Sequence, residues 1–470
     1  MLHLLKKTSI PTPVYSSFSP IPPDSPYLRL SGKLLTRDEL SCSSEELNGL
    51  LNQSILQITP SIYKNSVQKF CYRCGADKPY LFGIFLHAAC KKECTYCRNC
   101  IQMGRIIECE CLYAGSSLVE WTKHDGPCKW DGELMLAQKK AAEEIRETIE
   151  TKSELLVWAV CGAGKTEMLF PGLTRALELG LRICIATPRT DVVRELLPRL
   201  KNAFPLVTIQ GLYGDSEEKH GDAQLIITTT HQLYRYASAF DVMVIDEIDA
   251  FPYHKNDTLK YAAKRASKPG GARIYLTATP RKKEKILVRR KKLKAVFIPS
   301  RFHGYPLPVP VFQLTPMLRK KLDKGGLPES LLQKIRQQQK GNRQLLLFTS
   351  TVSQALQLEE LLAGKFTLTS VHAEDPERAQ KVQDFRDKKL SILITTTILE
   401  RGVTFPAVDV YVIDAGHEVF DEAALVQIAG RAGRSPDDPT GEVIFYHIGK
   451  ANAMIDAREA IIQMNKRAKR

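Results

Sequence analysis

One segment constrains the fold of this chain more than any other. An apolar run at 154–160, rich in strand-forming residues, passes directly into a short glycine loop, Cys161–Thr166, and then into a helical pattern that begins at Glu167. A strand, a glycine loop and a helix in this order are the context that a phosphate-binding loop requires. Gly162 and Gly164 allow backbone N–H groups to turn inward around phosphates, and the helix N-terminus adds partial positive charge. We therefore predict that ATP is bound by Gly162, Ala163, Gly164, Lys165 and Thr166.

Four side chains of this region are predicted to carry the chemistry of ATP hydrolysis. Lys165 reaches the β- and γ-phosphates, and the Thr166 hydroxyl coordinates the Mg²⁺ of Mg–ATP. A second apolar strand, at 242–246, ends in Asp246 and Glu247, at the edge of a parallel sheet where ligands bind. We expect Asp246 to hold Mg²⁺ and Glu247 to orient and polarise the attacking water. Paired acids at a strand end also suit a helix cap, but beside a lysine loop they indicate catalysis.

A second basic element lies far along the chain. Arg431 and Arg434 stand in the sequence Gln427–Arg434, and Gln427 precedes them on the same predicted surface. An arginine that meets the charge developing on a transferred phosphoryl group is worth on the order of 10³–10⁵ in rate. Lysine lacks the planar guanidinium fork and is no substitute there. We predict that both arginines are catalytic and that they face the glycine loop across a cleft. The alternative is a solvated basic helix start.

These segments resemble, in order over residues 130–450, the motifs of superfamily-two helicases, and the resemblance implies roles for further residues. Gln138 corresponds to the glutamine that reads adenine, and Gln427 to a further ATP contact. The resemblance implies that four residues hold the nucleic-acid backbone: Thr187, Arg189, Thr349 and Thr396. Three more are implied to couple hydrolysis to movement: Thr277, Thr279 and Gly402.

Within that superfamily the chain most resembles the ComFA family of late competence proteins. The resemblance rests on the acids at 246–249, on the strings at 188–196 and 399–406, and on an N-terminal cysteine cluster. It implies an ATPase of natural transformation that pulls single-stranded DNA into the cytoplasm. It also implies two partners, a phosphoribosyltransferase-like operon protein and a membrane DNA channel. The helicase PriA is a nearer relative than RNA helicases, but its zinc module is inserted between the lobes.

Nine cysteines stand between residues 71 and 128. Clustered Cys-x-x-Cys spacings without a secretory signal indicate metal rather than disulfides. Four thiolates around Zn²⁺ form a closed structural site, and we predict one zinc per chain at Cys71, Cys74, Cys97 and Cys100. The second pair follows the family pattern, whereas spacing alone permits Cys94 with Cys97. A redox dithiol, or a second metal that uses Cys109, Cys111 or Cys128, stays an alternative.

Apolar runs that alternate with amphipathic helical patterns predict an α/β fold of parallel sheets with crossover helices. With the resemblance, this gives two tandem RecA-like parallel-sheet lobes preceded by a small zinc-binding module. The expected domains are a Pro/Ser-rich tail with a short helix at 1–64, the zinc module at 65–129, and lobes at 130–300 and 301–470. Strands are predicted at 154–160, 182–187, 206–210, 224–229, 242–246, 273–278, 344–349, 367–371, 391–395, 409–413 and 442–447.

Composition favours a nucleic-acid partner. The 470 residues carry a formal net charge of +15 and a pI near 9.2, and no run is long enough to cross a bilayer. The basic run 281–294 either follows phosphates or forms a solvated helix or hairpin face. We expect a cytoplasmic protein, or one peripheral to the inner face of the membrane, that acts as an ATP-driven single-stranded DNA translocase. The alternative is a PriA-like DNA helicase of replication restart or repair.

Overall fold

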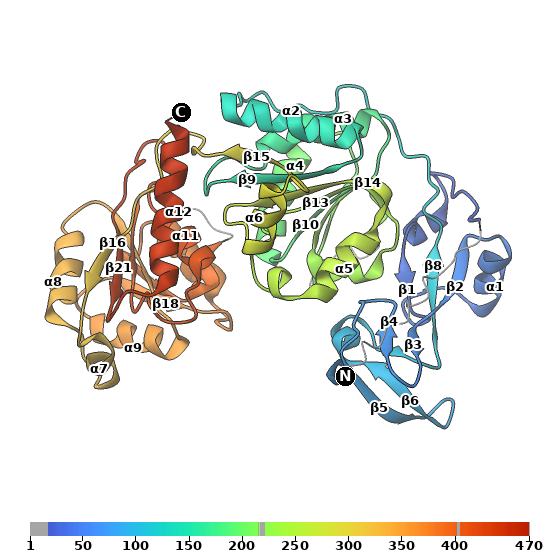
Figure 1. Ribbon diagram of the computed structural model, residues 1–470, viewed down its shortest axis with the longest axis horizontal. Helices are drawn as coiled ribbons and strands as arrows, with labels where there is room; N and C mark the ends of the chain where they lie inside the picture. Colours follow the sequence, from blue (N-terminus) through green and yellow to red (C-terminus); the bar gives the residue numbers. More distant parts are fainter. Residues whose placement is uncertain (1–16, 215, 217–220, 402–404, 470) are drawn as a thin grey trace, which may run out of the picture. The chain divides into compact units, whose positions relative to one another are not determined.

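The computed structural model describes residues 17–214, 216, 221–401 and 405–469 (Figure 1). By their internal contacts the residues form two compact units. The first comprises Met1–Gly132, Ala142–Leu155 and Leu169–Tyr275, and the second comprises Glu133–Ala141, Leu156–Met168 and Leu276–Arg470. The predicted architecture is confirmed, because a small N-terminal module precedes two parallel sheets with helices between their strands.

The N-terminal module contains three small antiparallel sheets, with strand orders β1-β8-β2, β3-β4 and β5-β6-β7. Its elements are the 3-10 helix η1 (Pro26–Leu30), β1 (Leu34–Leu35), α1 (Ser44–Asn52), β2 (Leu56–Pro60), β3 (Ile62–Lys64), β4 (Lys69–Cys71), η2 (Pro79–Leu81), β5 (Phe82–His87), β6 (Lys92–Cys97), η3 (Arg98–Met103), β7 (Ile106–Ile107) and β8 (Cys111–Gly115).

Residues on both sides of the expected 64/65 boundary share one sheet, since β8 pairs with both β1 and β2. The four domain ranges expected from the sequence stay predictions. The expected short helix near 37–51 is α1, which begins later in the chain. The Ser43 side chain accepts the Glu46 N–H at 3.1 Å, and this cap fixes where the helix starts.

The first lobe contains a seven-stranded sheet of order β11-β12-β10-β13-β14-β9-β15. The pairs from β11 to β14 are parallel. Its elements are α2 (Leu136–Glu150), β9 (Glu154–Ala159), η4 (Glu167–Leu169), α3 (Phe170–Glu178), β10 (Ile183–Thr187), α4 (Thr190–Ala203), β11 (Ile209–Leu212), β12 (Leu225–Thr229), η5 (Thr230–Arg235), β13 (Phe240–Ile245), η6 (Tyr253–Lys255), α5 (Asp257–Ala266), β14 (Ser267–Thr277), α6 (Lys282–Arg289) and β15 (Lys294–Ile298).

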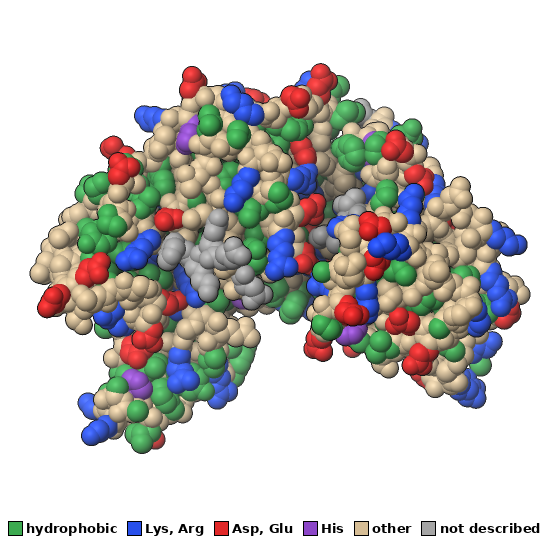
Figure 2. Space-filling view, turned by 180° about the vertical axis from the view of Figure 1, so that it is seen from behind, with side chains coloured by type: hydrophobic (Ala, Val, Ile, Leu, Met, Phe, Trp, Pro, Cys, Tyr) green, Lys and Arg blue, Asp and Glu red, His purple; other side chains and the backbone are tan. Residues whose placement is uncertain are grey.

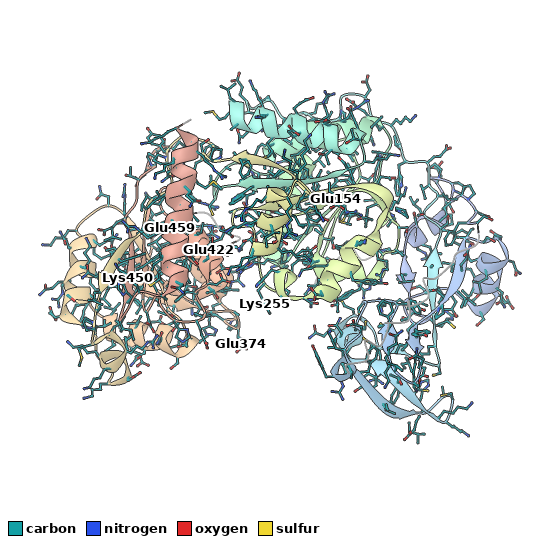
Figure 3. The ribbon with its side chains drawn as sticks, viewed as in Figure 1. Glu154, Lys255, Glu374, Glu422, Lys450 and Glu459 are labelled. Atoms are coloured by element: carbon teal, nitrogen blue, oxygen red, sulfur yellow. The ribbon has the colours of Figure 1, made fainter. Side chains whose placement is uncertain are left out.

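The six strands predicted for this lobe are present, and β15 is an addition to them. The central strands β10, β12 and β13 are buried on both faces, which is why they read as continuous apolar runs. Glu154, labelled in Figure 3 at the start of β9, accepts a hydrogen bond at 2.8 Å from the Arg273 guanidinium on β14.

The second lobe has a six-stranded parallel sheet of order β16-β21-β20-β17-β19-β18. Its elements are β16 (Val311–Leu314), α7 (Leu318–Asp323), α8 (Glu329–Gln338), β17 (Gln344–Phe348), α9 (Val352–Leu362), β18 (Leu368–Val371), α10 (Arg378–Arg386), β19 (Ile392–Thr395), η7 (Thr397–Glu400), β20 (Val408–Val412), α11 (Glu422–Ala429), β21 (Val443–His447) and α12 (Asn452–Ala468). All five predicted strands are present, and the edge strand β16 was not predicted.

The basic run 281–294 forms helix α6 and leads into β15. Two of its cations already have acidic partners at the start of α11, since Arg281 contacts Asp421 at 2.8 Å and Lys285 contacts Glu422 at 3.1 Å. The run is therefore helical over most of its length, and contact of its remaining cations with phosphates stays a prediction. In the part of the chain that the structure describes, no helix combines the length and apolarity needed for a membrane span.

Candidate nucleotide site and metal centre

The glycine loop that follows β9 has the backbone of a phosphate loop. Gly162 has φ +77° and Gly164 has φ +68°, a region that favours glycine. The Val160 N–H donates to the Ile298 carbonyl at 3.1 Å, and the Phe302 N–H donates to the Gly162 carbonyl at 2.9 Å. The start of the loop is thus tied to the end of β15 and to the residues after it. Lys165 and Thr166 follow directly and are half-buried.

Gln138 lies against this loop. Its side chain is buried, its amide donates to the Ala163 carbonyl at 2.8 Å, and its carbonyl oxygen accepts the Met135 N–H at 2.8 Å. A Cβ at Gly164 would stand 2.4 Å from the Gln138 amide nitrogen, so the close approach requires glycine at that position. The structure therefore brings Gln138 to the predicted ATP loop. Whether Gln138 reads adenine stays a prediction.

The loop also contacts the helix that carries Gln427. The Cys161 thiol donates to the Gln427 side-chain oxygen at 3.0 Å, and a Cβ at Gly430 would lie 2.6 Å from the Cys161 Cβ. Cys161 and Gln427 stand far apart in the sequence, but both belong to the second compact unit. Gln427 and the glycine loop are therefore neighbours, and a contact of Gln427 with ATP stays a prediction.

An arginine that the sequence analysis did not single out lies at the same place. Arg301 is buried, and its guanidinium donates to the carbonyls of Gly433 and Gly430, the latter at 3.4 Å. Burial lowers the pKa of Arg301 to about 10, and the nearby Arg434 cation acts in the same direction. Because Arg301 spans from the Gly162 side to the turn after α11, it is a positioning residue for that turn. No sequence motif marked it.

The two predicted catalytic arginines lie in the turn that follows α11. Arg431 is buried and its Nε donates to the Glu400 carbonyl at 3.1 Å. Arg434 follows Gly433, which has φ +63° and whose Cβ position is occupied by the Pro439 carbonyl. Glycine is thus required between the two arginines for the turn to close. Their catalytic role stays a prediction.

The predicted acids follow β13, in the first unit. The Asp246 N–H donates to the Ala186 carbonyl at 2.8 Å, and the Asp246 carboxylate accepts the Glu247 N–H at 2.8 Å. Glu247 has φ +52°, an unusual value for a residue with a side chain. Strain of this kind is typical of functional turns. The acid pair is therefore held at the carboxyl end of a buried strand, where the sequence placed it.

The predicted nucleic-acid contacts lie at strand ends and helix starts. Thr187 ends β10, Arg189 precedes α4, and Thr396 precedes η7. The buried Thr349 hydroxyl already donates to the Thr351 carbonyl at 3.1 Å. The predicted coupling residues Thr277, the last residue of β14, and Thr279 are both buried, and the Thr279 N–H donates to the Thr277 hydroxyl at 3.0 Å. Gly402 lies outside the described residues.

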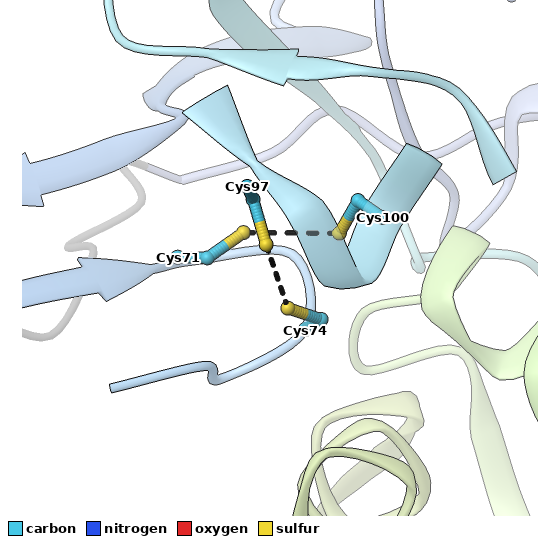
Figure 4. Close-up of side chains that lie close together, drawn as sticks. All are labelled: Cys71, Cys74, Cys97 and Cys100. Atoms are coloured by element: carbon cyan, nitrogen blue, oxygen red, sulfur yellow. Dashed lines mark hydrogen bonds between the residues drawn. The ribbon is translucent and has the colours of Figure 1, made fainter. Parts of the chain in front are cut away.

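Four cysteine side chains converge in the N-terminal module, as Figure 4 shows. The Sγ atoms of Cys71 and Cys100 are 3.9 Å apart, those of Cys74 and Cys97 are 3.5 Å apart, and all four lie within 4.8 Å of one another. A tetrahedral zinc with Zn–S bonds of about 2.3 Å requires S–S separations of about 3.8 Å. The residues therefore fit a Cys₄ zinc site. We name them the buried cluster.

The turn that carries Cys71 and Cys74 is packed against the first lobe. Gly75 has φ +74°, and a Cβ there would lie 2.4 Å from the Tyr261 ring of α5. The buried Arg73 pairs with Glu39 at 2.7 Å. Burial raises the pKa of Glu39, but the Arg73 charge and further hydrogen bonds outweigh burial and hold that pKa below its ordinary value.

Arg265, at the end of α5, joins the same turn to the lobe. Its guanidinium donates to the carbonyls of Tyr72 (3.0 Å) and Arg73 from the module, and of Tyr234 (2.7 Å) and Tyr236 (3.0 Å) from the lobe. One side chain therefore ties the backbone of the cysteine turn to the backbone of η5. The buried cluster lies where the module meets the lobe.

The strand register separates Cys94 from Cys97. Cys94 and Cys97 both lie on β6, three residues apart, and side chains at an odd spacing on a strand point to opposite faces. Cys97 turns to the buried cluster, whereas Cys94 groups with His87, Cys90 and Cys109. The sequence analysis named Cys109 as an alternative ligand of a second metal. It did not assign His87, Cys90 or Cys94 to that metal. Of these, only the local Cys90–Cys94 spacing was a visible signal.

Three protein-family models match the chain. They are the competence protein ComFA N-terminal domain over residues 26–114, the type III restriction enzyme res subunit over 131–282, and the helicase conserved C-terminal domain over 327–436. The first spans the cysteine-containing module. The other two cover the two parallel-sheet lobes.

Among solved structures, the chain is similar in fold to *S. cerevisiae* Dbp5 bound to RNA and ADP BeF3, with a TM-score of 0.52 and 18% identity over 70% of this chain and 91% of that chain. It is also similar to *Mycobacterium smegmatis* helicase Lhr bound to ssDNA and AMP-PNP, with a TM-score of 0.51 and 17% identity over 72% of this chain and 50% of that chain. At these identities the likeness shows the two-lobed helicase fold alone.

Two relatives are similar over almost the full length. Competence protein ComFA of *Bacillus subtilis* is 46% identical over 93% of this chain and 95% of its own length. Competence protein ComFA of *Streptococcus pneumoniae* is 38% identical over 93% of this chain and 98% of its own length. The chain therefore belongs to the ComFA family of competence proteins, within the superfamily-two helicases.

Proposed function

We propose that this protein is an ATP-driven translocase of single-stranded DNA that serves DNA import during natural transformation. The observation that carries the proposal is the glycine loop, with Gly162 and Gly164 in the left-handed region and Lys165 directly after them. Family membership supplies the process, and the net charge of +15 supports a nucleic-acid partner. The proposal assigns the motor to the lobes and not to the N-terminal module.

In the proposed cycle, each site residue has one task. The Lys165 ammonium holds the β- and γ-phosphates, while Glu247 orients the attacking water and accepts its proton. The Arg431 and Arg434 guanidinium groups stabilise the charge that develops on the γ-phosphoryl oxygens. Mg²⁺, held by Thr166 and Asp246, would supply further charge neutralisation at the phosphates.

Arg301 suggests how the nucleotide state reaches the arginine turn. Its guanidinium donates to two carbonyls of that turn, and its stem lies beside Gly162, since a Cβ added to that glycine would stand 3.8 Å from the Arg301 Cγ, an ordinary van der Waals distance. A change in the glycine loop on nucleotide binding would therefore move the turn that carries Arg431 and Arg434. Thr277 and Thr279 are the proposed link from hydrolysis to movement.

We infer that Thr187, Arg189, Thr349 and Thr396 hold phosphates of the strand in alternation. Phosphate contacts carry no sequence information, so binding should tolerate any sequence and weaken with salt. The proposed setting is the cytoplasm or the inner face of the membrane. A phosphoribosyltransferase-like competence protein and a membrane DNA channel are the proposed partners.

Lys165→Ala tests the nucleotide site. We expect ATP hydrolysis to fall to background, because the lysine is the only loop side chain placed to neutralise the transferred phosphoryl group. The measurement is the steady-state ATPase rate with single-stranded DNA, duplex DNA and RNA compared side by side. Lys140→Ala, at an exposed position on α2, is the matched control and should leave the rate unchanged. ATPase that single-stranded DNA still stimulates in Lys165→Ala would contradict the assignment.

A duplex-unwinding helicase of replication restart or repair is the second candidate. One relative favours it, since ATP-dependent DNA helicase RecG of *Streptococcus pneumoniae* is 26% identical over 69% of this chain. Translocation predicts that the protein displaces streptavidin from a biotinylated single strand without opening a forked duplex. Efficient strand separation of the fork would favour the second candidate, and stimulation by RNA alone would exclude both.

A further inference from the structure

A second group of metal-binding side chains lies in the N-terminal module, outside the buried cluster. His87 ends β5, Cys90 lies in the turn that follows, Cys94 lies on β6, and Cys109 follows β7. The ligand atoms of the four side chains all lie within 4.8 Å of one another. We name this group the hairpin cluster. It shares no residue with the buried cluster.

The distances in the hairpin cluster match a tetrahedral metal site. The Sγ atoms of Cys90 and Cys94 are 3.3 Å apart, those of Cys90 and Cys109 are 3.7 Å apart, and His87 Nδ1 lies 3.0 Å from Cys109 Sγ. Zinc with bonds of about 2.3 Å to sulfur and about 2.0 Å to nitrogen requires edges of about 3.8 Å and about 3.6 Å. The Cys90–Cys109 separation agrees closely, and the other two are shorter than these edges by roughly half an ångström, so small side-chain movements would admit the ion.

The backbone brings these residues together from three segments. The β5–β6 pairing places His87 opposite Lys92, and the Lys91 N–H donates to the His87 carbonyl at 2.8 Å to close the turn that holds Cys90. The Glu108 N–H donates to the Thr95 carbonyl at 2.8 Å, and the Glu108 carboxylate accepts the Thr95 N–H at 3.1 Å. This reciprocal pair fixes Cys109 beside the hairpin.

A carboxylate completes the arrangement around the imidazole. His87 Nδ1 faces the sulfur atoms, and His87 Nε2 lies 3.8 Å from a Glu110 carboxylate oxygen. A histidine that binds metal through one ring nitrogen commonly presents the other N–H to a carboxylate, which fixes the tautomer and the ring orientation. Glu110, which directly follows Cys109 in the chain, is placed for this role.

Part of the apolar surface of the hairpin lies in solvent. Ile84 is 59% exposed and Leu86 is 71% exposed on β5, and Figure 2 shows hydrophobic, basic and histidine side chains close together at the end of the module. Small elements without a sufficient apolar core are commonly stabilised by a metal. A disulfide would use only two of the four side chains and leave a thiol and an imidazole facing it. All cysteines in the structure are free thiols.

We propose that His87, Cys90, Cys94 and Cys109 form a second structural zinc site, of Cys₃His composition, so that the chain binds two zinc ions. The site closes the β5–β6 hairpin onto the turn after β7. Three of its four residues are at least partly exposed, whereas the buried cluster is fully enclosed. The hairpin site therefore exchanges its metal with chelators faster than the buried one does.

The test is zinc content per chain, measured by plasma mass spectrometry on the full-length protein purified under reducing conditions. We expect two zinc ions in the unmodified protein and one in the double variant Cys90→Ser/Cys109→Ser. The control is Cys111→Ser, which removes an exposed thiol two residues from Cys109 that is outside the cluster, and which should retain two. One zinc ion in the unmodified protein, or two in the double variant, would overturn the proposal.

A second measurement keeps the proposal testable if the double variant folds poorly. Cobalt replaces zinc, and its thiolate charge-transfer absorption grows with the number of sulfur ligands. The unmodified protein should bind Co²⁺ at one site with three thiolates and one with four, and a chelator should remove them in two phases, the three-thiolate site first. A single phase with a pure four-thiolate spectrum, or a Cys90–Cys94 disulfide found in the reduced preparation, would contradict the proposal.

Discussion

The two cysteine clusters of the N-terminal module have similar internal geometry but different surroundings. The four side chains of the buried cluster are fully enclosed, and their turn contacts α5 and η5 of the first lobe through Gly75, Arg73 and Arg265. The hairpin cluster has an exposed member, Cys109, and its neighbours come from its own hairpin and the following turn. The first cluster lies at an interface between the module and the lobe, and the second lies within a single hairpin and the turn beside it.

This difference teaches that ligand spacing alone does not tell what a metal stabilises. Apparent zinc-binding free energies are on the order of 10 kcal/mol at such sites. In the buried cluster a bound zinc would also fix the backbone carbonyls of Tyr72 and Arg73, to which Arg265 of the lobe donates. Loss of metal from the buried cluster should destabilise the contact with the lobe, whereas loss of metal from the hairpin cluster should destabilise only the hairpin and the turn beside it.

Removal of a buried ligand should have the largest effect. We expect Cys74→Ser to abolish cooperative folding of the module, because the lost metal energy is comparable to the whole stability of a small domain. Zinc content, thermal unfolding and limited proteolysis of the full-length protein measure the outcome. Cys111→Ser is the control, and an unchanged unfolding temperature in Cys74→Ser would show that the buried cluster does not hold the interface.

Arg265→Ala should separate docking from metal binding. The substitution leaves several carbonyls of the module and the lobe without their donor, and each buried unsatisfied group costs about 1–3 kcal/mol. We expect a loss of about 3 kcal/mol in the free energy of unfolding, easier proteolysis between module and lobe, and unchanged zinc content. Lys264→Ala, an exposed neighbour on α5, serves as the control. Loss of zinc in Arg265→Ala would mean that docking and metal binding cannot be separated.

The sequence predicted those features that depend on residues close together along the chain. The glycine loop, the acid pair and the buried parallel strands all have local signatures, because a phosphate loop needs glycine at fixed positions and a strand covered on both faces is continuously apolar. The same holds for the turn Cys71–Cys74. Its partner pair was assigned to Cys97 and Cys100 only through the family pattern. The strand register of β6 gives the physical reason why Cys97, and not Cys94, lies beside this turn, and zinc binding by the four thiols stays a prediction.

The features that sequence reasoning missed depend on tertiary contacts. His87 and Cys109 come together only through the β5–β6 pairing and the turn after β7, and neither stands in a Cys-x-x-Cys spacing. In the sequence Arg301 cannot be told apart from the other cations of a basic chain. Only the fold shows that it is buried and that it contacts the glycine backbone of the arginine turn. The edge strand β16 has both ends more than half exposed, so it lacks the alternation that marks a half-buried strand.

The smallest expected effect concerns the residue that orients the histidine of the hairpin cluster. Glu110→Gln keeps the shape of the side chain but removes the charge that lies 3.8 Å from His87 Nε2. Loss of such a partner typically weakens metal binding 10–100-fold. Competition with a zinc chelator should therefore show about a tenfold weaker hairpin site, with the buried site and the unfolding temperature of the lobes unchanged. Glu93→Gln, an exposed acid on β6 outside the cluster, should bind zinc as the unmodified protein does. Equal affinity in Glu110→Gln would mean that the backbone alone sets the imidazole orientation, and weakening at both sites would mean that the clusters are coupled after all.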